Sequence, residues 1–256
     1  MAAVFFERIK GFFRGLSGGL HPLQAAEERI EIHPVGEIVE NLCKIADAAW
    51  ARYAFSREPL NGKFNDAQRL ELTRKALACG SEIAVGCARQ HGTSDPALLA
   101  EALGLKVDYP ATPQDTDRVL FAEYREPNLI HVYMDCLDRA EKLFYEPGVA
   151  EALGDCGQLK NLLIAHELYH HLEKQRERDV WTKAYRVTLW KLGPIRNRST
   201  ISVLSEIAAM GFSKELTGIQ YSPYVLDAFL VYGYSPQIAS ALYEEMTRFA
   251  LAPLID

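Results

Sequence analysis

The sequence predicts an α+β fold that is mostly helical, with a small β-sheet packed on the helix that contains His166 and His170. Apolar residues recur at helical spacing through most of the chain, which is typical of helices that bury one face. Two β-rich segments, 119–125 and 129–134, flank a short link at 126–128 (Glu-Pro-Asn), which indicates a hairpin. Helices are expected before and after this hairpin, and that order is characteristic of α+β proteins.

Residues 1–92 are predicted to form a helical N-terminal layer. It begins with an amphipathic helix at 3–16 and a hinge at 17–34, and it continues with helices at 35–57 and 66–90. No group of residues in this layer has the spacing of a metal site or of an activated nucleophile. We therefore expect it to support the protein structurally and not to form a catalytic unit.

The first sixteen residues combine an apolar stripe at helical spacing with interrupting charges. The stripe consists of Phe5, Ile9, Phe12, Phe13 and Leu16. The charges at Glu7, Arg8, Lys10 and Arg14 argue against a signal peptide. Such a helix docks on the protein's own body or, as the alternative, on a membrane surface or a partner through residues 1–16.

Residues 93–256 are predicted to form a second domain, which contains the sheet and the metal helix. A capping residue followed by proline at 94–96 starts a short helix, and a strand follows at 105–109. Further helices are expected at about 135–146, 158–176, 180–192, 200–217 and 223–250. An exposed edge of the sheet is expected near 128–134, where an extended peptide can pair with the backbone.

The most specific signal is the segment His-Glu-Leu-Tyr-His at residues 166–170. Because an α-helix has 3.6 residues per turn, His166 and His170 project from one face and can bind one Zn²⁺. Glu167 then lies beside the open position of the metal, where it can take a proton from a water molecule. An apolar run precedes the motif, and polar side chains on a buried helix need partners. The sequence therefore predicts a zinc site with Glu167 as general base.

A catalytic zinc site usually has a third protein ligand, and Glu206 is the best candidate. It lies on a second largely apolar helix and has no charged neighbour one turn away, so a buried Glu206 needs a distant partner. Glu173 is the competing candidate, although three ligands on one straight helix converge poorly. We expect Glu173 to support the site or to be solvated. His171 lies one turn after Glu167 and either orients it or is an ordinary packed or solvent-facing histidine.

Composition excludes several classes of protein. The net charge of −6 gives no overall basic signature for nucleic-acid binding, so none is expected. Five scattered cysteines without a C-x-x-C pair favour reduced thiols and a cytoplasmic protein. No apolar run reaches the length of a transmembrane helix.

The segments 95–107, 129–133, 163–172 and 205–212 together resemble the ImmA/IrrE-type metallopeptidase family. The resemblance covers about residues 93–220 and is most specific at the His-Glu-x-x-His helix. It implies a zincin-like fold, an intracellular protein and a protein substrate, for which helix-turn-helix transcriptional repressors are one class. It also implies that the ligand set His166, His170 and Glu206 binds Zn²⁺ and that Glu167 is the general base.

The chain departs from the family pattern at Tyr169, in the connection that follows the His-Glu-x-x-His helix, at Met210 and in the unmatched residues 1–92. Tyr169 stands where a small residue is common, so it is expected either to narrow the cleft or to bind a substrate carbonyl through its hydroxyl. The connection between the two metal helices is long, and residues 174–198 carry eight basic residues with interleaved aromatics. We interpret this segment as a solvated helix with an aromatic packing face; the alternative is a docking patch for an acidic protein.

These observations favour a zinc-dependent metallopeptidase that hydrolyses a peptide bond in a protein substrate. The alternative is a catalytically silent regulatory module that binds metal and partners on the same fold. The two hypotheses differ in whether replacing Glu167 changes the activity of the protein, since only a peptidase needs a general base.

Overall fold

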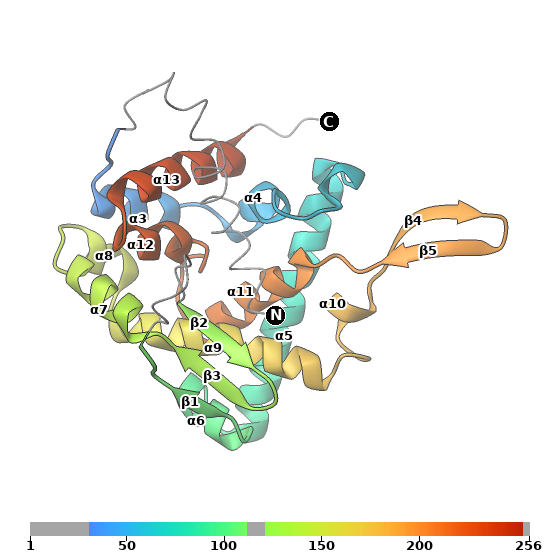
Figure 1. Cartoon of the computed structure of the whole chain (residues 1–256), viewed down its shortest axis with the longest axis horizontal. Coiled ribbons are helices and arrows are strands. Elements are labelled where there is room, and N and C mark those ends of the chain that lie inside the picture. Colours follow the sequence, from blue (N-terminus) through green and yellow to red (C-terminus); the bar gives the residue numbers. More distant parts are fainter. Residues whose placement is uncertain (1–30, 112–120, 253–256) are drawn as a thin grey trace.

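The computed structural model describes residues 31–111 and 121–252, which are mostly helical with two small sheets (Figure 1). The amphipathic helix expected at 3–16 and most of the hinge at 17–34 lie outside these residues. The helices are α3 (Val35–Cys43), α4 (Ala51–Phe55), α5 (Asp66–His91), α6 (Pro96–Ala102), α7 (Met134–Leu143), α8 (Val149–Leu153), α9 (Gly157–Gln175), α10 (Trp181–Ala184), α11 (Val203–Thr217), α12 (Val225–Tyr232) and α13 (Pro236–Leu251), with 3₁₀ turns η1 (Asp47–Trp50) and η2 (Asn61–Lys63).

Helix boundaries follow local sequence signals at several ends. Asn65 and Gln68 form a reciprocal capping box at the start of α5. The Asp95 carboxylate accepts hydrogen bonds from the first backbone N–H groups of α6, with Pro96 next in the chain, as the sequence predicts. Gly92 ends α5 in the left-handed conformation, at φ 70°.

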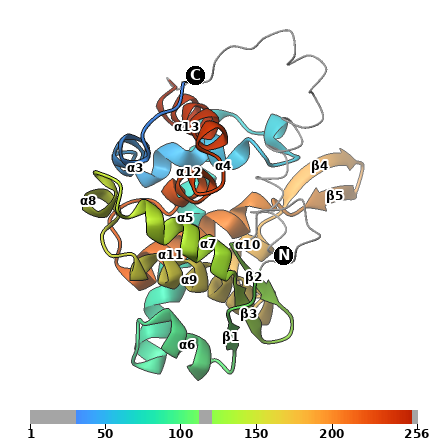
Figure 2. The same ribbon diagram turned by 60° about the vertical axis from the view of Figure 1, so that its left-hand side comes forward.

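The first sheet contains β1 (Lys106–Asp108), β2 (Ala122–Arg125) and β3 (Leu129–Val132) in the order β1-β3-β2. β1 runs parallel to β3, and β2 runs antiparallel to it, with Tyr124 opposite Ile130. The expectation of an exposed edge near 128–134 is wrong, because β3 is the central strand and is paired on both sides. β2 and β3 both pack on α9, and β2 is an edge strand of the sheet (Figure 2).

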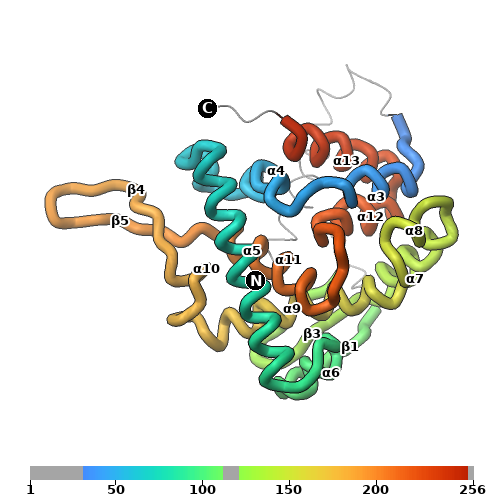
Figure 3. Tube along the Cα trace, turned by 180° about the vertical axis from the view of Figure 1, so that it is seen from behind, coloured from blue at the N-terminus to red at the C-terminus, as the bar shows by residue number. Residues whose placement is uncertain are grey.

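Helix α5 packs along α11 more extensively than along any other helix, and α11 packs on α9 (Figure 3). Two glycines make the contact between α5 and α11 possible. A Cβ atom on Gly80 would lie 1.9 Å from the Ala208 carbonyl oxygen, and one on Gly211 would lie 2.5 Å from the Leu77 carbonyl oxygen. These backbones therefore touch, and the contact fixes the position of α11 relative to the rest of the protein.

Replacing Gly80 by Ala should destabilise the protein by about 1–3 kcal/mol, because the added methyl group must push α11 away. Gly86 is the matched control, since it lies on the same helix and a Cβ there meets nothing within 4 Å. Gly86→Ala should stabilise the protein by about 0.5–1 kcal/mol through helix propensity. Urea denaturation of both variants measures the difference, and equal stabilities would contradict the proposed role of Gly80.

Three predicted helices are wrong in detail. The helix expected at 35–57 is interrupted after α3, and the one expected at 223–250 is divided where Ser235 caps α13 ahead of Pro236. The helix expected at 180–192 is largely replaced by a hairpin of β4 (Val187–Leu192) and β5 (Ile195–Ser199). Its turn contains Gly193 at φ 58°, a conformation that favours glycine and ends any helix before Pro194.

One hydrophobic core contains buried residues from both sides of residue 92, among them Trp50, Ala76, Ile164 and Phe229. Among the described residues, no helix combines the length and the apolar character needed to cross a lipid bilayer.

Candidate metal centre

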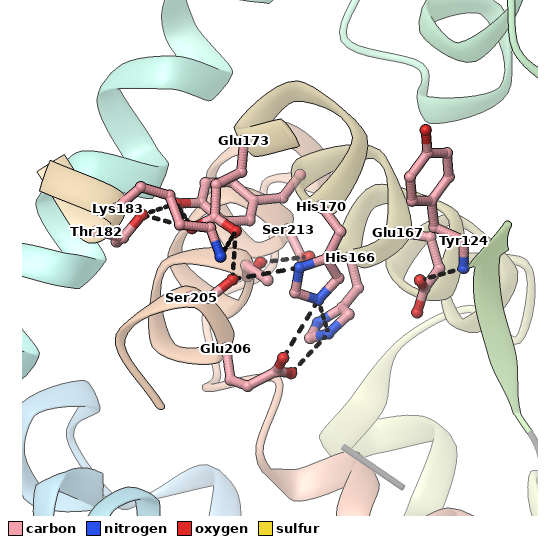
Figure 4. A network of polar contacts seen from close by, with 12 residues as sticks. Tyr124, His166, Glu167, His170, Glu173, Thr182, Lys183, Ser205, Glu206 and Ser213 are labelled. Atoms are coloured by element: carbon pink, nitrogen blue, oxygen red, sulfur yellow. Dashed lines mark hydrogen bonds and ion pairs between the residues drawn. The ribbon is translucent and has the colours of Figure 1, made fainter. Parts of the chain in front are cut away.

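Helix α9 presents two histidines to the interior of the protein. It is buried on nearly every side, since from Leu159 to Glu173 only Lys160, Asn161 and His166 are not fully buried. The helical spacing brings the Nε2 atoms of His166 and His170 to 3.2 Å from each other (Figure 4). The His166 side chain is 12 % exposed and the His170 side chain 1 %, so the pair opens toward solvent on the His166 side.

Helix α11 supplies the third donor. Glu206 lies with its carboxylate 3.3 Å from His166 Nε2 and 3.5 Å from His170 Nε2. Zinc bonds of about 2.0–2.1 Å in a tetrahedron require donor atoms about 3.3–3.4 Å apart. The three distances between the donors therefore match a tetrahedral zinc site and leave a fourth corner for another ligand. Within the described ranges, no other group of His, Cys, Asp and Glu side chains has this arrangement.

The electrostatics of the three donors are consistent with a cation site. Glu206 is 1 % exposed, and apart from the adjacent histidines its buried Oε2 atom has no hydrogen-bond partner. Burial disfavours the charged carboxylate, but the adjacent His170 and His166 outweigh it and hold the pKa of Glu206 below its ordinary value. Burial also opposes protonation of His170, yet the carboxylate of Glu206 raises the pKa of His170 from 6.5 to about 9. Two imidazole nitrogens and one carboxylate form a common ligand set for catalytic zinc.

Zinc binding at pH 7 should release the proton of His170. With a pKa of about 9, His170 is protonated at pH 7 in the metal-free protein, and a metal ligand must be neutral. Apparent zinc affinity should therefore rise with pH from 7 and level off above about 9. Calorimetric titration in two buffers of different ionisation enthalpy counts the released protons, and a count of zero at pH 7 would contradict this protonation state.

Glu173, the competing ligand candidate, lies outside the donor cluster and supports it. It is fully buried, and Ser205 Oγ donates to it at 2.5 Å. The same Ser205 oxygen lies 3.4 Å from Nδ1 of His170, so Ser205 links Glu173 to a donor residue. Lys183 Nζ, 3.0 Å from Glu173, compensates the buried charge. Such outer partners fix the orientation of a ligating imidazole.

Tyr169 is directed into the same buried cluster. Its hydroxyl is 3.1 Å from Thr182 Oγ1 and 3.4 Å from Glu173, and its side chain has no exposed surface. Tyr169 therefore contacts Glu173, and it is not among the residues that line the recess beside His166 and Glu167. Sequence reasoning missed Ser205 and Thr182; the one available signal was a serine next to Glu206 on a buried helix.

Glu167 is held by the sheet. The backbone N–H of Tyr124 on β2 donates to Glu167 Oε2 at 2.6 Å. Glu167 is 4 % exposed, and burial raises its pKa above the ordinary value. His171 forms its hydrogen bond with the Tyr124 hydroxyl, 3.1 Å from its Nδ1, and not with Glu167, so both residues contact the same tyrosine at different atoms.

A small apolar recess with a cavity volume of about 30 Å³ adjoins the two motif residues His166 and Glu167. Its other walls come from β2, α9, α11, α12 and nearby loops, and they are almost entirely apolar. They comprise Phe121, Ala122, Leu162, Leu163, Met210, Ser213, Pro223, Leu226 and Leu230. A group that enters this recess therefore lies beside the donor cluster in an apolar environment.

Comparison with family models, with curated proteins and with solved structures gives no match to this chain. The described residues bring His166, His170 and Glu206 into one cluster compatible with a metal ion, with Glu167 beside it.

Proposed function

We propose that the protein is a zinc-dependent metallopeptidase that cleaves a peptide bond in a protein substrate. One observation carries the proposal: three donors at tetrahedral spacing lie beside a buried glutamate that the edge of a sheet holds in place. A purely structural zinc site usually has four protein ligands, whereas a catalytic one keeps a corner open. The ImmA/IrrE resemblance and a zincin-like fold are part of this proposal.

Glu167 is suited to act as the general base. When bound, a zinc ion supplies a Lewis acid that polarises a carbonyl group and acidifies water. The Tyr124 N–H binds Oε2 of Glu167, which leaves Oε1 to take the proton from water. Burial raises the pKa of Glu167, which makes it a stronger base and lets it pass the proton to the leaving amine near neutral pH.

Strand β2 provides the edge along which an extended substrate would lie. On the side of β2 that faces β3, the Phe121 carbonyl oxygen accepts a hydrogen bond from the Tyr133 N–H. On the opposite side, the Tyr124 N–H donates to Glu167. Because backbone groups alternate sides along a strand, the backbone of Ala122 also faces away from β3. A peptide that pairs there lies next to the donor cluster, and strand addition is a common way of binding peptides.

The apolar recess supports a preference for an apolar side chain in the substrate. Leu162, Leu226 and Leu230 line it close to His166 and Glu167. Each CH₂ group that leaves water for such a recess gains roughly 0.8 kcal/mol. We propose that substrates have an apolar residue next to the bond that is cleaved.

The test is cleavage of a mixture-based peptide library by the purified full-length chain, read by mass spectrometry. We expect cleavage that phenanthroline stops and added zinc restores, with apolar residues enriched on one side of the cut. Replacing Leu226 by Asp at the wall of the recess should remove this enrichment. A chain that retains zinc but cleaves no peptide would contradict the proposal and favour the catalytically silent metal-binding module.

A further inference from the structure

The β4–β5 hairpin extends from the body of the protein, as Figures 1 and 3 show. Its strands pair with each other in an antiparallel ladder that closes at Leu192 and Ile195. Near its base, Lys63 donates a hydrogen bond to the Leu189 carbonyl oxygen. An isolated two-stranded hairpin is only marginally stable in water, so its exposed faces need an explanation.

The register of the ladder places apolar side chains on one face of the hairpin and basic side chains on the other. Leu192 and Ile195 are paired at the tip, and Trp190 lies two residues back on the same face. These three side chains are 71 %, 60 % and 49 % exposed. They are three of the ten large hydrophobic side chains that are exposed in the described ranges, and they occur within six residues. Clustered exposure of this kind marks an interaction surface.

The other face is cationic. Lys191 and Arg196 are paired directly behind the tip, and Arg198 lies two residues further along β5. Residues 180–205 contain no Asp or Glu, although the whole chain has a net charge of −6. Positive charge is therefore concentrated on the part of the protein that projects furthest from its body, which favours an anionic partner.

We propose that this hairpin is a docking arm that binds the surface of an anionic lipid bilayer. Leu192 and Ile195 would enter the boundary of the acyl chains, while Lys191, Arg196 and Arg198 bind lipid phosphates. At about 3.3 Å per residue, Trp190 lies roughly 7 Å behind the tip, at the interfacial depth that tryptophan prefers. A nucleic acid would match the cations but would leave the apolar tip in water.

The proposal is tested by flotation of the full-length chain with vesicles of phosphatidylcholine that contain about 30 % phosphatidylserine. We expect binding to these vesicles and little binding to phosphatidylcholine alone. Trp190 fluorescence should be quenched by brominated lipids, against a background from buried Trp50 and partly buried Trp181. Replacing Lys191, Arg196 and Arg198 by Gln should weaken binding about fivefold per cation at low salt.

The decisive variant replaces Trp190, Leu192 and Ile195 by Ser, and binding should fall at least about tenfold. The matched control replaces Leu98, Tyr145 and Leu251, which are 55 %, 85 % and 65 % exposed elsewhere on the surface, and it should bind as wild type does. Circular dichroism establishes that both variants remain folded.

Three results would overturn the proposal. The first is absence of binding to anionic vesicles. The second is vesicle binding that survives the hairpin substitutions, which would assign it to another segment, such as the apolar stripe of residues 1–16. The third is binding of duplex DNA or polyglutamate through the hairpin cations in place of vesicles, which would give the arm a different partner.

Discussion

Replacing Glu206 by Gln should abolish stable zinc binding, whereas the same replacement at Glu173 should leave it largely intact. Glu206 faces both imidazole nitrogens at 3.3 and 3.5 Å, while Glu173 reaches His170 only through Ser205. A neutral amide at position 206 removes a charged donor, so affinity should fall by more than about a hundredfold, beyond the 10- to 100-fold that removal of an outer partner costs. Elemental mass spectrometry and competition with a fluorescent chelator measure the zinc content and the affinity.

The variants Glu206→Gln and Glu173→Gln are well matched, because both glutamates are buried on neighbouring helices and both replacements keep the shape of the side chain. The Glu173→Gln protein should lose about tenfold in zinc affinity through looser positioning of His170. Full zinc content in Glu206→Gln combined with loss in Glu173→Gln would reverse the assignment of the third ligand. Equal retention in both would show that the two histidines bind zinc without a carboxylate.

Replacing Glu167 by Gln should lower the turnover of any cleaved peptide by about 10²–10⁴-fold, the range that a positioned general base contributes. The zinc content should remain that of wild type, because Glu167 is not among the three clustered donors. The side-chain carbonyl of the introduced glutamine can still accept the Tyr124 N–H, so the fold of the site should persist. Single-turnover kinetics on a library-derived peptide separate the chemical step from binding.

Tyr124→Phe is the control for this experiment. It removes the hydroxyl that contacts His171 and the Pro127 carbonyl but keeps the backbone N–H that binds Glu167. Turnover within a few-fold of wild type is expected, since the backbone and not the side chain positions the base. A Glu167→Gln protein as active as wild type would remove Glu167 from the mechanism.

The helical parts of the fold could largely be predicted because their signals are local. Helix α9 was expected at 158–176 and spans Gly157–Gln175, and α5 was expected at 66–90 and spans Asp66–His91. Apolar periodicity and capping residues lie within a few positions of the helices that they define. The strands at 105–109, 119–125 and 129–134 were also expected close to where β1, β2 and β3 lie.

The hairpin at residues 187–199 was missed because its signals conflict. Trp181, Tyr185 and Leu192 share a helical spacing that suggested a packing face, yet Val187–Leu192 is rich in β-formers and Gly193-Pro194 follows it. The exposed edge of the first sheet was misplaced for a different reason: strand order depends on which strands meet in space. Neither pairing nor solvent exposure is encoded within a window of a few residues.

The sequence by itself determined that His166 and His170 lie together on one face of a helix with Glu167 next to them, because the 3.6-residue helical repeat converts spacing directly into geometry. Only the tertiary structure decided that Glu206, and not Glu173, lies with the two histidines, since this depends on how closely α11 approaches α9. The backbone contact of α5 with α11 at Gly80 helps to fix this approach. The tertiary structure likewise decided that a backbone N–H of β2 holds Glu167, because hydrogen bonds between distant segments form only when the core packs.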